Sequence, residues 1–276
     1  MTTARDGWDM PISEDQLARL TRDMETAHRD TLPAMRAGAV DLAADIRDTR
    51  GGPQGAPRDP GRRRFLTGTG GLAAAMALAA CSSSDKQGSG SPSKGAGAAP
   101  SPSGSAKSRY TGDLKVVALA VALENQAVGA YQAALAAAKA GKLGTVPPAV
   151  ATFVTTAMAQ HSDHAKAWNS VLTGAGVPAI HDVPLSNQPA TLAALGKATT
   201  VTDVAKLALQ LEDQAAQTYL FATYNVSAAA GVATAASIAP VEAMHAAILH
   251  FVLGQYPVPD DFLPVDKAAD PALLTV

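Results

Sequence analysis

The stretch LEDQAAQTY, residues 211–219, decides the fold of this chain, because LENQAVGAY at residues 123–131 repeats its pattern. In each copy a Leu-Glu pair is followed by Gln two residues after the Glu and by Tyr seven residues after it. Each copy also precedes a second apolar stretch with two polar residues spaced three apart, which are His161 and His164 in the first case and Glu242 and His245 in the second. Two copies of a helix pair with inward-facing polar residues are typical of a four-helix bundle with a site at its centre.

The composition favours an all-α protein. Of the 276 residues 47% are apolar but only 4% are aromatic, and Ala dominates from Leu114 onward. Ala is the best helix former, whereas sheets favour β-branched and aromatic residues. The net charge of −2 gives no basic footprint, so we expect no nucleic-acid partner. The single cysteine, Cys81, excludes a disulfide framework within the chain.

Residues 1–61 form a polar extension and linker. The sequence from Ser13 to Gln16 resembles a capping box that opens a short helix, with Leu17, Leu20 and Met24 on one face. A second, weak helix is expected from Ala34 to Asp48, before a Gly- and Pro-rich linker. A start codon assigned too far upstream, with Met35 as the true start, is an equal alternative, and the sequence indicates no function for this region.

Residues 62–80 have the layout of an export leader. Arg62, Arg63 and the following Phe65 and Leu66 resemble a twin-arginine signal, and the apolar run from 68 to 80 is too short to span a bilayer. The run ends in Leu-Ala-Ala-Cys81, which resembles a lipobox, the motif in which the cysteine is lipidated and becomes the mature N-terminus. We therefore expect export by the twin-arginine machinery and a lipid anchor on the outer face of the cytoplasmic membrane.

Residues 81–109 are rich in Ser, Gly, Ala and Pro, so we expect a disordered tether. A bundle domain is expected over residues 110–256, followed by a tail over 257–276. The expected helices run from Asp113 to Ala140, from Pro147-Pro148 to about Gly174, from an N-cap at Thr202 to about Tyr224, and from Thr234 to Leu253. Residues 175–200 are long enough for one crossover along the bundle. Pro240 should kink the last helix or leave backbone groups free there.

The polar residues of the four helices should lie at one height. If the first hairpin turns near residue 144, Glu124 and His164 are equally far from the turn. If the second turns near residue 228, Glu212 and His245 are nearly level in the same way. A spacing of three residues places His161 beside His164, and Glu242 beside His245, on shared helix faces.

The use of glutamate supports this convergence. From Cys81 onward the chain has three glutamates, at positions 124, 212 and 242, although Glu normally decorates the outer faces of soluble helices. Three of the five histidines in that region belong to the same layer. His181 and His250 fall outside the layer, and we read them as ordinary loop or surface residues.

Together these residues resemble the ferritin-like domain, and the closest branch is that of bacterial exported ferritin-like proteins, some of them labelled desiccation-related. The likeness rests on the two glutamate repeats and on VEAMHAA at residues 241–247. It implies a metal centre, iron first with zinc or manganese as alternatives, held by Glu124, His164, Glu212, Glu242 and His245. His161 stands where the family has a bridging Glu, so one or two ions are expected. Tyr131 and Tyr219 would support the ligands as packing residues with a hydrogen-bonding hydroxyl.

Two functions remain open at the level of sequence. An active centre would carry out iron- or oxygen-linked redox chemistry, such as ferrous oxidation or peroxide removal. Alternatively, the glutamates and histidines neutralise one another in a metal-free polar core, and the protein is a non-enzymatic binding or protective module of the envelope. A third reading places these residues on the surface, but their equal distances from the two predicted turns argue against it. The sequence is compatible with a monomer or an oligomer.

Overall fold

The structure, a computed structural model, describes residues 10–51, 108–257 and 264–276. Within these ranges every regular element is helical, apart from an isolated antiparallel bridge between Leu185 and Leu274. The expected leader, with Arg62, Arg63, Phe65 and Leu66, and the lipobox Cys81 lie outside the described residues, as does most of the expected tether.

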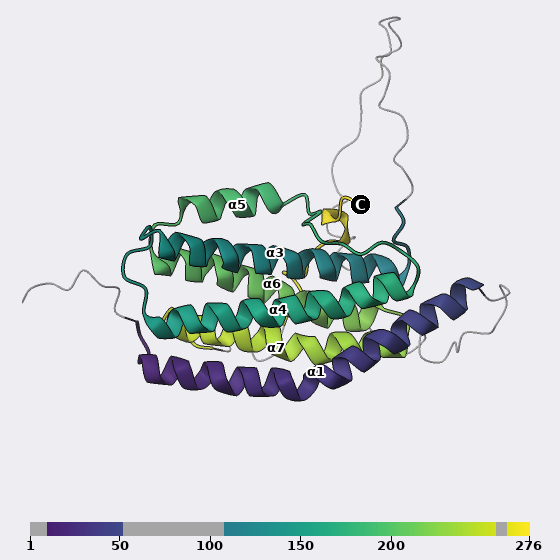
Figure 1. Ribbon diagram of the computed structural model, residues 1–276, viewed down its shortest axis with the longest axis horizontal. Coiled ribbons are helices and arrows are strands. Elements are labelled where there is room, and N and C mark those ends of the chain that lie inside the picture. The colour runs from purple at the N-terminus through teal and green to yellow at the C-terminus, as the bar shows by residue number, and fades with distance from the viewer. Residues whose placement is uncertain (1–9, 52–107, 258–263) are drawn as a thin grey trace, which may run out of the picture. The chain divides into compact units, whose positions relative to one another are not determined.

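Four long helices form the bundle, as predicted (Figure 1). They are α3 (Asp113–Lys139), α4 (Pro148–Gly174), α6 (Val201–Asn225) and α7 (Ala229–Val252). Helices α3 and α4 pack as one pair and α6 and α7 as the other, while α3 also contacts α6. A long crossover joins the two pairs. It contains a short helix that the sequence did not predict, α5 (Gln188–Lys197), which lies on α3 and α6.

Two helix starts differ from the sequence prediction. The N-cap of α6 is Thr200 rather than Thr202, because the Thr200 hydroxyl and the Asp203 side chain bond each other's backbone N–H groups in a capping box. Helix α7 begins at Ala229, before the expected Thr234, and continues through Pro240. The short loop before it is fixed by Asp113, whose carboxylate accepts hydrogen bonds from two backbone N–H groups of the loop.

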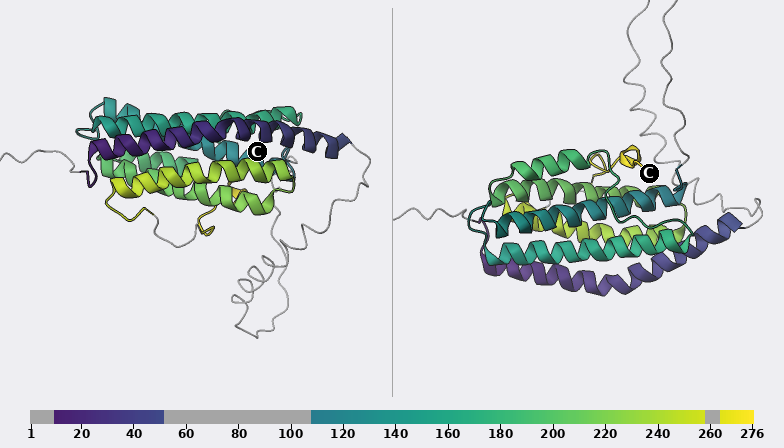
Figure 2. Two further views of the ribbon diagram at one scale, coloured as in Figure 1. Left: turned by 90° about the horizontal axis from the view of Figure 1, so that it is seen from below. Right: turned by 45° about the horizontal axis from the view of Figure 1, so that its top comes forward.

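The N-terminal segment differs most from the prediction. In place of one short and one weak helix, the chain forms a single helix, α1 (Glu14–Gly51), opened by the predicted capping box between Ser13 and Gln16. Pro33 lies inside this helix, and Figure 1 shows that α1 bends partway along its length. Proline usually ends a helix, but α1 continues through Pro33, so the two predicted helices are one. Within the bundle unit, α1 lies along both α4 and α7 (Figure 2).

Helix α1 contacts the bundle through one continuous stripe. Its buried residues are spaced by three, four or seven positions, as in helices that pack along their whole length. They are Leu17, Thr21, Met24, His28, Met35, Ala39, Leu42 and Ile46, with Ala43 beside them. Most of the charged residues of α1 are exposed, although Glu14, Glu25 and Arg36 contact α4. This mixture made the region look polar in sequence.

Glycines allow α1 to approach closely in its second half. A Cβ atom added to Gly38 would lie 2.5 Å from the Thr234 hydroxyl oxygen, and one added to Gly174 would lie 2.7 Å from the Cβ of Ala43. Real Cβ contacts are not this short, so no larger residue fits at either position without displacement. The packing of α1 is therefore complementary in detail to α4 and α7.

The C-terminal residues 264–276 are ordered against the bundle. The backbone N–H of Ala269 donates to the Thr218 hydroxyl on α6 at 2.8 Å, and that of Thr275 donates to the Pro184 carbonyl in the crossover at 2.9 Å. A single 3-10 turn, η1 (Pro271–Leu273), lies between these contacts. The tail and α5 therefore both lie on the side of the bundle formed by α3, α6 and the crossover.

Within the described ranges, α7 is the one helix long and apolar enough to cross a membrane. In the bundle, however, 56% of its most apolar window is buried. It also carries Glu242 and His245, which are fully buried. We therefore interpret α7 as the core helix of the bundle.

Removing Leu42 tests whether α1 is an integral part of the fold. This side chain is fully buried, and Leu42→Ala should lower the free energy of unfolding by about 2–5 kcal/mol, the usual cost of a cavity in a packed core. Val40, which is 64% exposed on the same helix, is the matched control, and Val40→Ala should change it by no more than about 0.5 kcal/mol. Chemical denaturation of the full chain measures both, and equal values for the two variants would contradict the docking of α1.

Candidate metal centre

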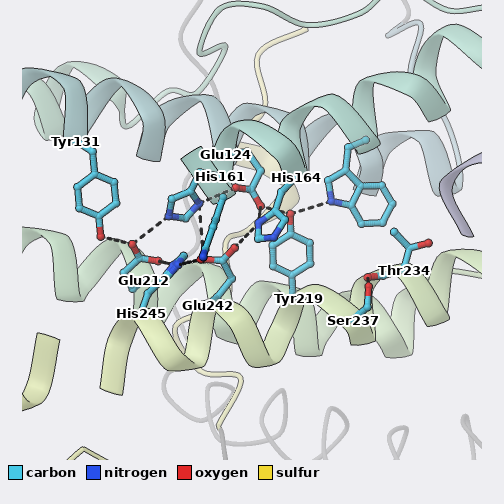
Figure 3. Close-up of polar contacts among 12 residues, drawn as sticks. Glu124, Tyr131, His161, His164, Glu212, Tyr219, Thr234, Ser237, Glu242 and His245 are labelled. Atoms are coloured by element: carbon cyan, nitrogen blue, oxygen red, sulfur yellow. Dashed lines mark hydrogen bonds and ion pairs between the residues drawn. The ribbon is translucent and has the colours of Figure 1, made fainter. Parts of the chain in front are cut away.

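The structure brings all six residues of the predicted polar layer together (Figure 3). Each is at most 2% exposed, so the reading of these residues as surface groups is excluded. They come from all four bundle helices: Glu124 from α3, His161 and His164 from α4, Glu212 from α6, and Glu242 and His245 from α7.

His161 lies between the two glutamates of the repeat. Its Nδ1 is 2.7 Å from an oxygen of Glu124, and its Nε2 is 3.1 Å from an oxygen of Glu212. Glu242 comes within 3.7 Å of the same ring. The imidazole therefore joins the α3 half of the layer to the α6 half.

The other two histidines meet at Glu242. His164 Nδ1 lies 2.8 Å from Glu242 Oε1, and His245 Nδ1 lies 3.1 Å from Glu242 Oε2 and 3.2 Å from Glu212 Oε2. Although the first of these contacts is short, neither His164 Nδ1 nor Glu242 Oε1 makes a hydrogen bond of acceptable geometry. Both atoms are buried and lie close together without the geometry of a hydrogen bond, as two ligands of one cation would.

Each tyrosine of the repeat bonds the glutamate of the other copy. Tyr131, from the first copy, donates its hydroxyl hydrogen to Glu212 of the second, and Tyr219, from the second copy, donates to Glu124 of the first. The Tyr219 oxygen in turn accepts from Trp168 Nε1 at 2.9 Å. Burial, together with the charge of the neighbouring glutamate, raises the pKa of both tyrosines well above its ordinary value, so their hydroxyls remain protonated donors.

Attraction between the glutamate carboxylates and the histidine rings sets the protonation states of the layer. Burial raises the pKa of a carboxyl group, yet the charges and hydrogen bonds of His164 and His161 outweigh this effect and lower the pKa of Glu124 to about 2. Burial alone would lower the pKa of His164, but Glu124 and Glu242 raise it to about 9. The pKa of His161 and that of His245 are raised for the same reason. Without a metal ion the histidines therefore hold protons that balance the carboxylates.

Two overlapping groups of side chains could each hold a metal ion. In each group the ligand atoms lie within 4.8 Å of one another and all residues are buried. One group is Glu124, His161, His164 and Glu242, and the other is His161, Glu212, Glu242 and His245. Imidazole nitrogens with carboxylate oxygens are suitable ligands for iron, zinc or manganese. The close approach of His164 Nδ1 and Glu242 Oε1 agrees with such a site.

Three polar residues at the layer were not identified from the sequence. Gln160, on α4, accepts from His245, and Glu25 and His28, on α1, contact Gln160 and His164 respectively. The adjacency of Gln160 to His161 was the available signal for the first.

Two histidines were predicted to lie outside the layer as loop or surface residues. His250 is instead buried, with 8% of its surface exposed, and its Nδ1 bonds Gln255 at the covered end of α7. His181 is exposed, as expected.

A small cavity between α3 and α6 borders the layer. It is lined by Leu123, Gln126, Leu211 and Gln214 together with the ligand candidates Glu124 and His161. It has room for about one water molecule. Next to the layer there is therefore space for a small species but none for an organic substrate.

Comparison with known proteins gives one match. A family model described as the ferritin-like domain matches residues 112–255, which contain the four bundle helices and the whole polar layer. No curated protein and no solved structure matches the chain.

The protonated histidines predict how stability depends on pH when metal is removed. Groups with a raised pKa, such as His164, stabilise the fold fully below their unfolded value of 6.5, and this contribution is lost as the pH rises through about 9. The lowered pKa of Glu124 stabilises above 4.5 and is lost as the pH falls toward about 2. In chelator, the free energy of unfolding should therefore be highest between pH 4.5 and pH 6.5 and should decline above pH 6.5.

His164→Gln is the matched variant, because it keeps a polar side chain without a titrating ring. The alkaline decline should be shallower in this variant, as measured by thermal denaturation across pH 5–10 in chelator. A stability that is flat from pH 6.5 to 9 in the unaltered chain would contradict the assignment of protons to the histidines.

Proposed function

The chain belongs to the ferritin-like family, and from this membership we propose that its polar layer binds a divalent metal ion. The observation that carries the proposal is the pair of overlapping, fully buried ligand groups, in which His164 Nδ1 and Glu242 Oε1 lie 2.8 Å apart without the geometry of a hydrogen bond. Buried charged groups are usually paired with one another or bound to metal.

Iron is the first candidate for this ion, with zinc and manganese as alternatives. Bound iron would supply one-electron redox chemistry, and the corresponding activities are ferrous oxidation and peroxide removal. The protein's own contribution is to hold the ligands and exclude bulk water. Tyr131 and Tyr219 keep Glu212 and Glu124 oriented, and the small cavity between α3 and α6 has room for about one water molecule beside the ligands.

The charge of the layer favours one ion over two. Three glutamates contribute −3, so two divalent ions would leave +1 and two trivalent ions +3. An uncompensated charge in a low-dielectric core costs roughly several kcal/mol even after relaxation. A fourth carboxylate, in place of His161, would remove the excess charge of two divalent ions and reduce that of two trivalent ions.

The geometry of His161 also favours one bound ion over two. Its Nδ1 faces Glu124 in one ligand group and its Nε2 faces Glu212 in the other. A neutral imidazole keeps one N–H and has one lone pair, so it can bind an ion on one side only. Filling both groups through this residue would require the loss of both ring protons. We therefore propose one tightly bound divalent ion, or two held weakly, with slow ferrous oxidation.

A metal-free protective or binding module is the second candidate function. The observation in its favour is the balance of three carboxylates against three histidines with a raised pKa, joined by contacts of 2.7–3.2 Å. Such a cluster can be neutral without metal. Elemental analysis of the natively purified protein separates the two functions. Stoichiometric metal supports the first, whereas a metal-free protein whose thermal stability is unchanged by chelator supports the second.

Replacing His161 by Glu tests the charge argument. His161→Glu should raise the metal content toward two ions per chain and increase the rate of ferrous oxidation, because the new carboxylate can bridge two ions. His181→Glu, an exposed change outside the layer, is the control and should alter neither quantity. If the unaltered chain already binds two irons tightly and oxidises them quickly, and His161→Glu changes neither, the argument is wrong.

For localisation, we propose an exported lipoprotein anchored to the outer face of the cytoplasmic membrane, of the exported ferritin-like branch. The support is in the sequence, where the Arg62-Arg63 pair and a lipobox ending at Cys81 occur in the order and spacing of a lipoprotein leader. The Ser- and Gly-rich residues that follow would connect the anchor to the bundle. The partners are then the twin-arginine machinery and the membrane itself.

Two substitutions test this localisation. Cys81→Ala should abolish lipid labelling and release the protein from membranes, and the double change Arg62→Lys with Arg63→Lys should retain it in the cytosol. Ser82→Ala and Arg58→Lys are the matched neighbours and should leave both steps unchanged. Fractionation with lipid labelling measures the outcome, and normal export and membrane attachment in the test variants would exclude the proposal.

A further inference from the structure

We propose that Glu25, on α1, is a positioning residue of the metal centre, which acts through Gln160 to hold the His245 ring in the tautomer whose Nδ1 faces the glutamates. The inference rests on the metal binding proposed above and concerns a helix outside residues 112–255, which match the family model. It gives α1 a role beyond the burial of apolar surface.

A continuous chain of hydrogen bonds connects α1 to the polar layer. Gln160 Nε2 donates to Glu25 Oε2 at 2.8 Å, and Gln160 Oε1 lies 2.8 Å from His245 Nε2. Gln160 is 1% exposed, so in the intact chain these two side chains and not bulk water are its partners. An amide has one donating and one accepting end, whereas an ionised carboxylate only accepts. Glu25 therefore determines which end of the Gln160 amide faces His245.

The orientation of Gln160 selects the tautomer of the ring. Because Gln160 Oε1 can only accept, His245 Nε2 must carry a hydrogen. The nitrogen that can lose its proton to a cation is then Nδ1, which lies 3.1 Å from Glu242 and 3.2 Å from Glu212. A metal ion binds an unprotonated imidazole nitrogen, and the hydrogen bond at the other nitrogen sets which one is available.

Without the carboxylate the amide is free to turn over. Gln160 could then present its NH₂ group to His245 Nε2, which would have to accept, and the remaining proton would move to Nδ1. That nitrogen would point a hydrogen at the site of the ion. Loss of Glu25 therefore weakens metal binding although no ligand is removed.

Glu25 is held in its ionised form. Arg29, one turn along α1, lies 2.5 Å from Glu25 Oε1, on the side opposite the oxygen that bonds Gln160. Partial burial would raise the pKa of this carboxyl group, but the hydrogen bonds from Gln160 and Arg29 lower it below its ordinary value. The carboxylate thus remains an obligate acceptor.

His28 shows that α1 is fitted to the layer at this height. Its ring lies edge-on to that of His164, with centroids 5.2 Å apart, and its Nε2 is buried without a hydrogen-bond partner. Among the buried residues of α1, which are otherwise apolar apart from Thr21, this histidine is three positions from Glu25. Helix α1 therefore contacts one ligand on α4 directly and one on α7 through Gln160.

Cobalt(II) binding to the full chain tests the proposal, with zinc as a second probe. Glu25→Leu should weaken cobalt binding by about 10–100-fold, the usual effect of losing a hydrogen-bond partner behind a metal ligand, and should change the visible spectrum of the bound ion. Glu25→Gln, which retains an accepting oxygen, should restore most of the affinity. In the zinc-loaded chain, ¹H–¹⁵N correlation of the ring should place the hydrogen of His245 on Nε2, and Glu25→Leu should reduce this signal.

The controls separate positioning from docking of α1. Glu14, on the same helix, bonds the backbone N–H of Ala149 on α4 far from the layer, so Glu14→Leu should leave cobalt binding unchanged. Gln160→Ala should weaken binding as much as Glu25→Leu, and the double variant should be no weaker than Gln160→Ala alone, because both act through one path.

The outcomes distinguish this proposal from the metal binding on which it rests. If the unaltered chain binds neither cobalt nor zinc, both are overturned. If it binds them and Glu25→Leu binds equally well, or if the two single effects add in the double variant, only the role of Glu25 is overturned.

Discussion

The burial of three carboxylates in a core built largely of alanine is the constraint on which the rest of the structure depends. Glu124, Glu212 and Glu242 are each at most 2% exposed, and an isolated buried carboxylate is not tolerated in an apolar interior. Three histidines supply the compensating protons or, with a metal ion, the remaining ligands. The exchanged tyrosines then donate additional hydrogen bonds to Glu212 and Glu124. Small side chains elsewhere let the helices approach closely enough for these contacts to form.

The two halves of the bundle are similar in plan but differ where the chemistry is decided. The tyrosine contacts obey the repeat, since each copy donates to the glutamate of the other. His161 and Glu242 do not obey it, because one is a histidine and the other a carboxylate at corresponding positions. The coverings differ as well. Helix α5 and the C-terminal tail lie on the side of α3 and α6, while α1 lies along α4 and α7. A ligand layer whose symmetry is broken at His161 and Glu242 is thus placed in surroundings that are also asymmetric.

The sequence predicted the bundle and the convergence of the six polar residues because both follow from spacing. Glu124 and Glu212 mark a repeat, and residues three positions apart share a helix face. The ligand role of these six residues remains a prediction. What spacing could not provide is the partner across the bundle. Tyr131 and Tyr219 were placed beside the layer, but which glutamate each one bonds depends on how the two hairpins face one another. The role of Gln160 and the docking of α1 were missed because they depend on tertiary contacts, and because Pro33 and many charged residues concealed the stripe of α1.

The position of α1 in the chain has a consequence for the order of events in the cell. Helix α1 precedes the proposed leader at residues 62–80, and the bundle follows that segment. A membrane crossing that begins at the leader leaves the first part of the chain behind, so under the proposed export no single molecule can be both delivered and still covered by α1. The bundle would fold and bind its metal ion with α1 in contact, and export would then separate α1 from the bundle. The same ligands would then work in two settings, one on each side of the membrane, with the Gln160 amide held in the first and released in the second.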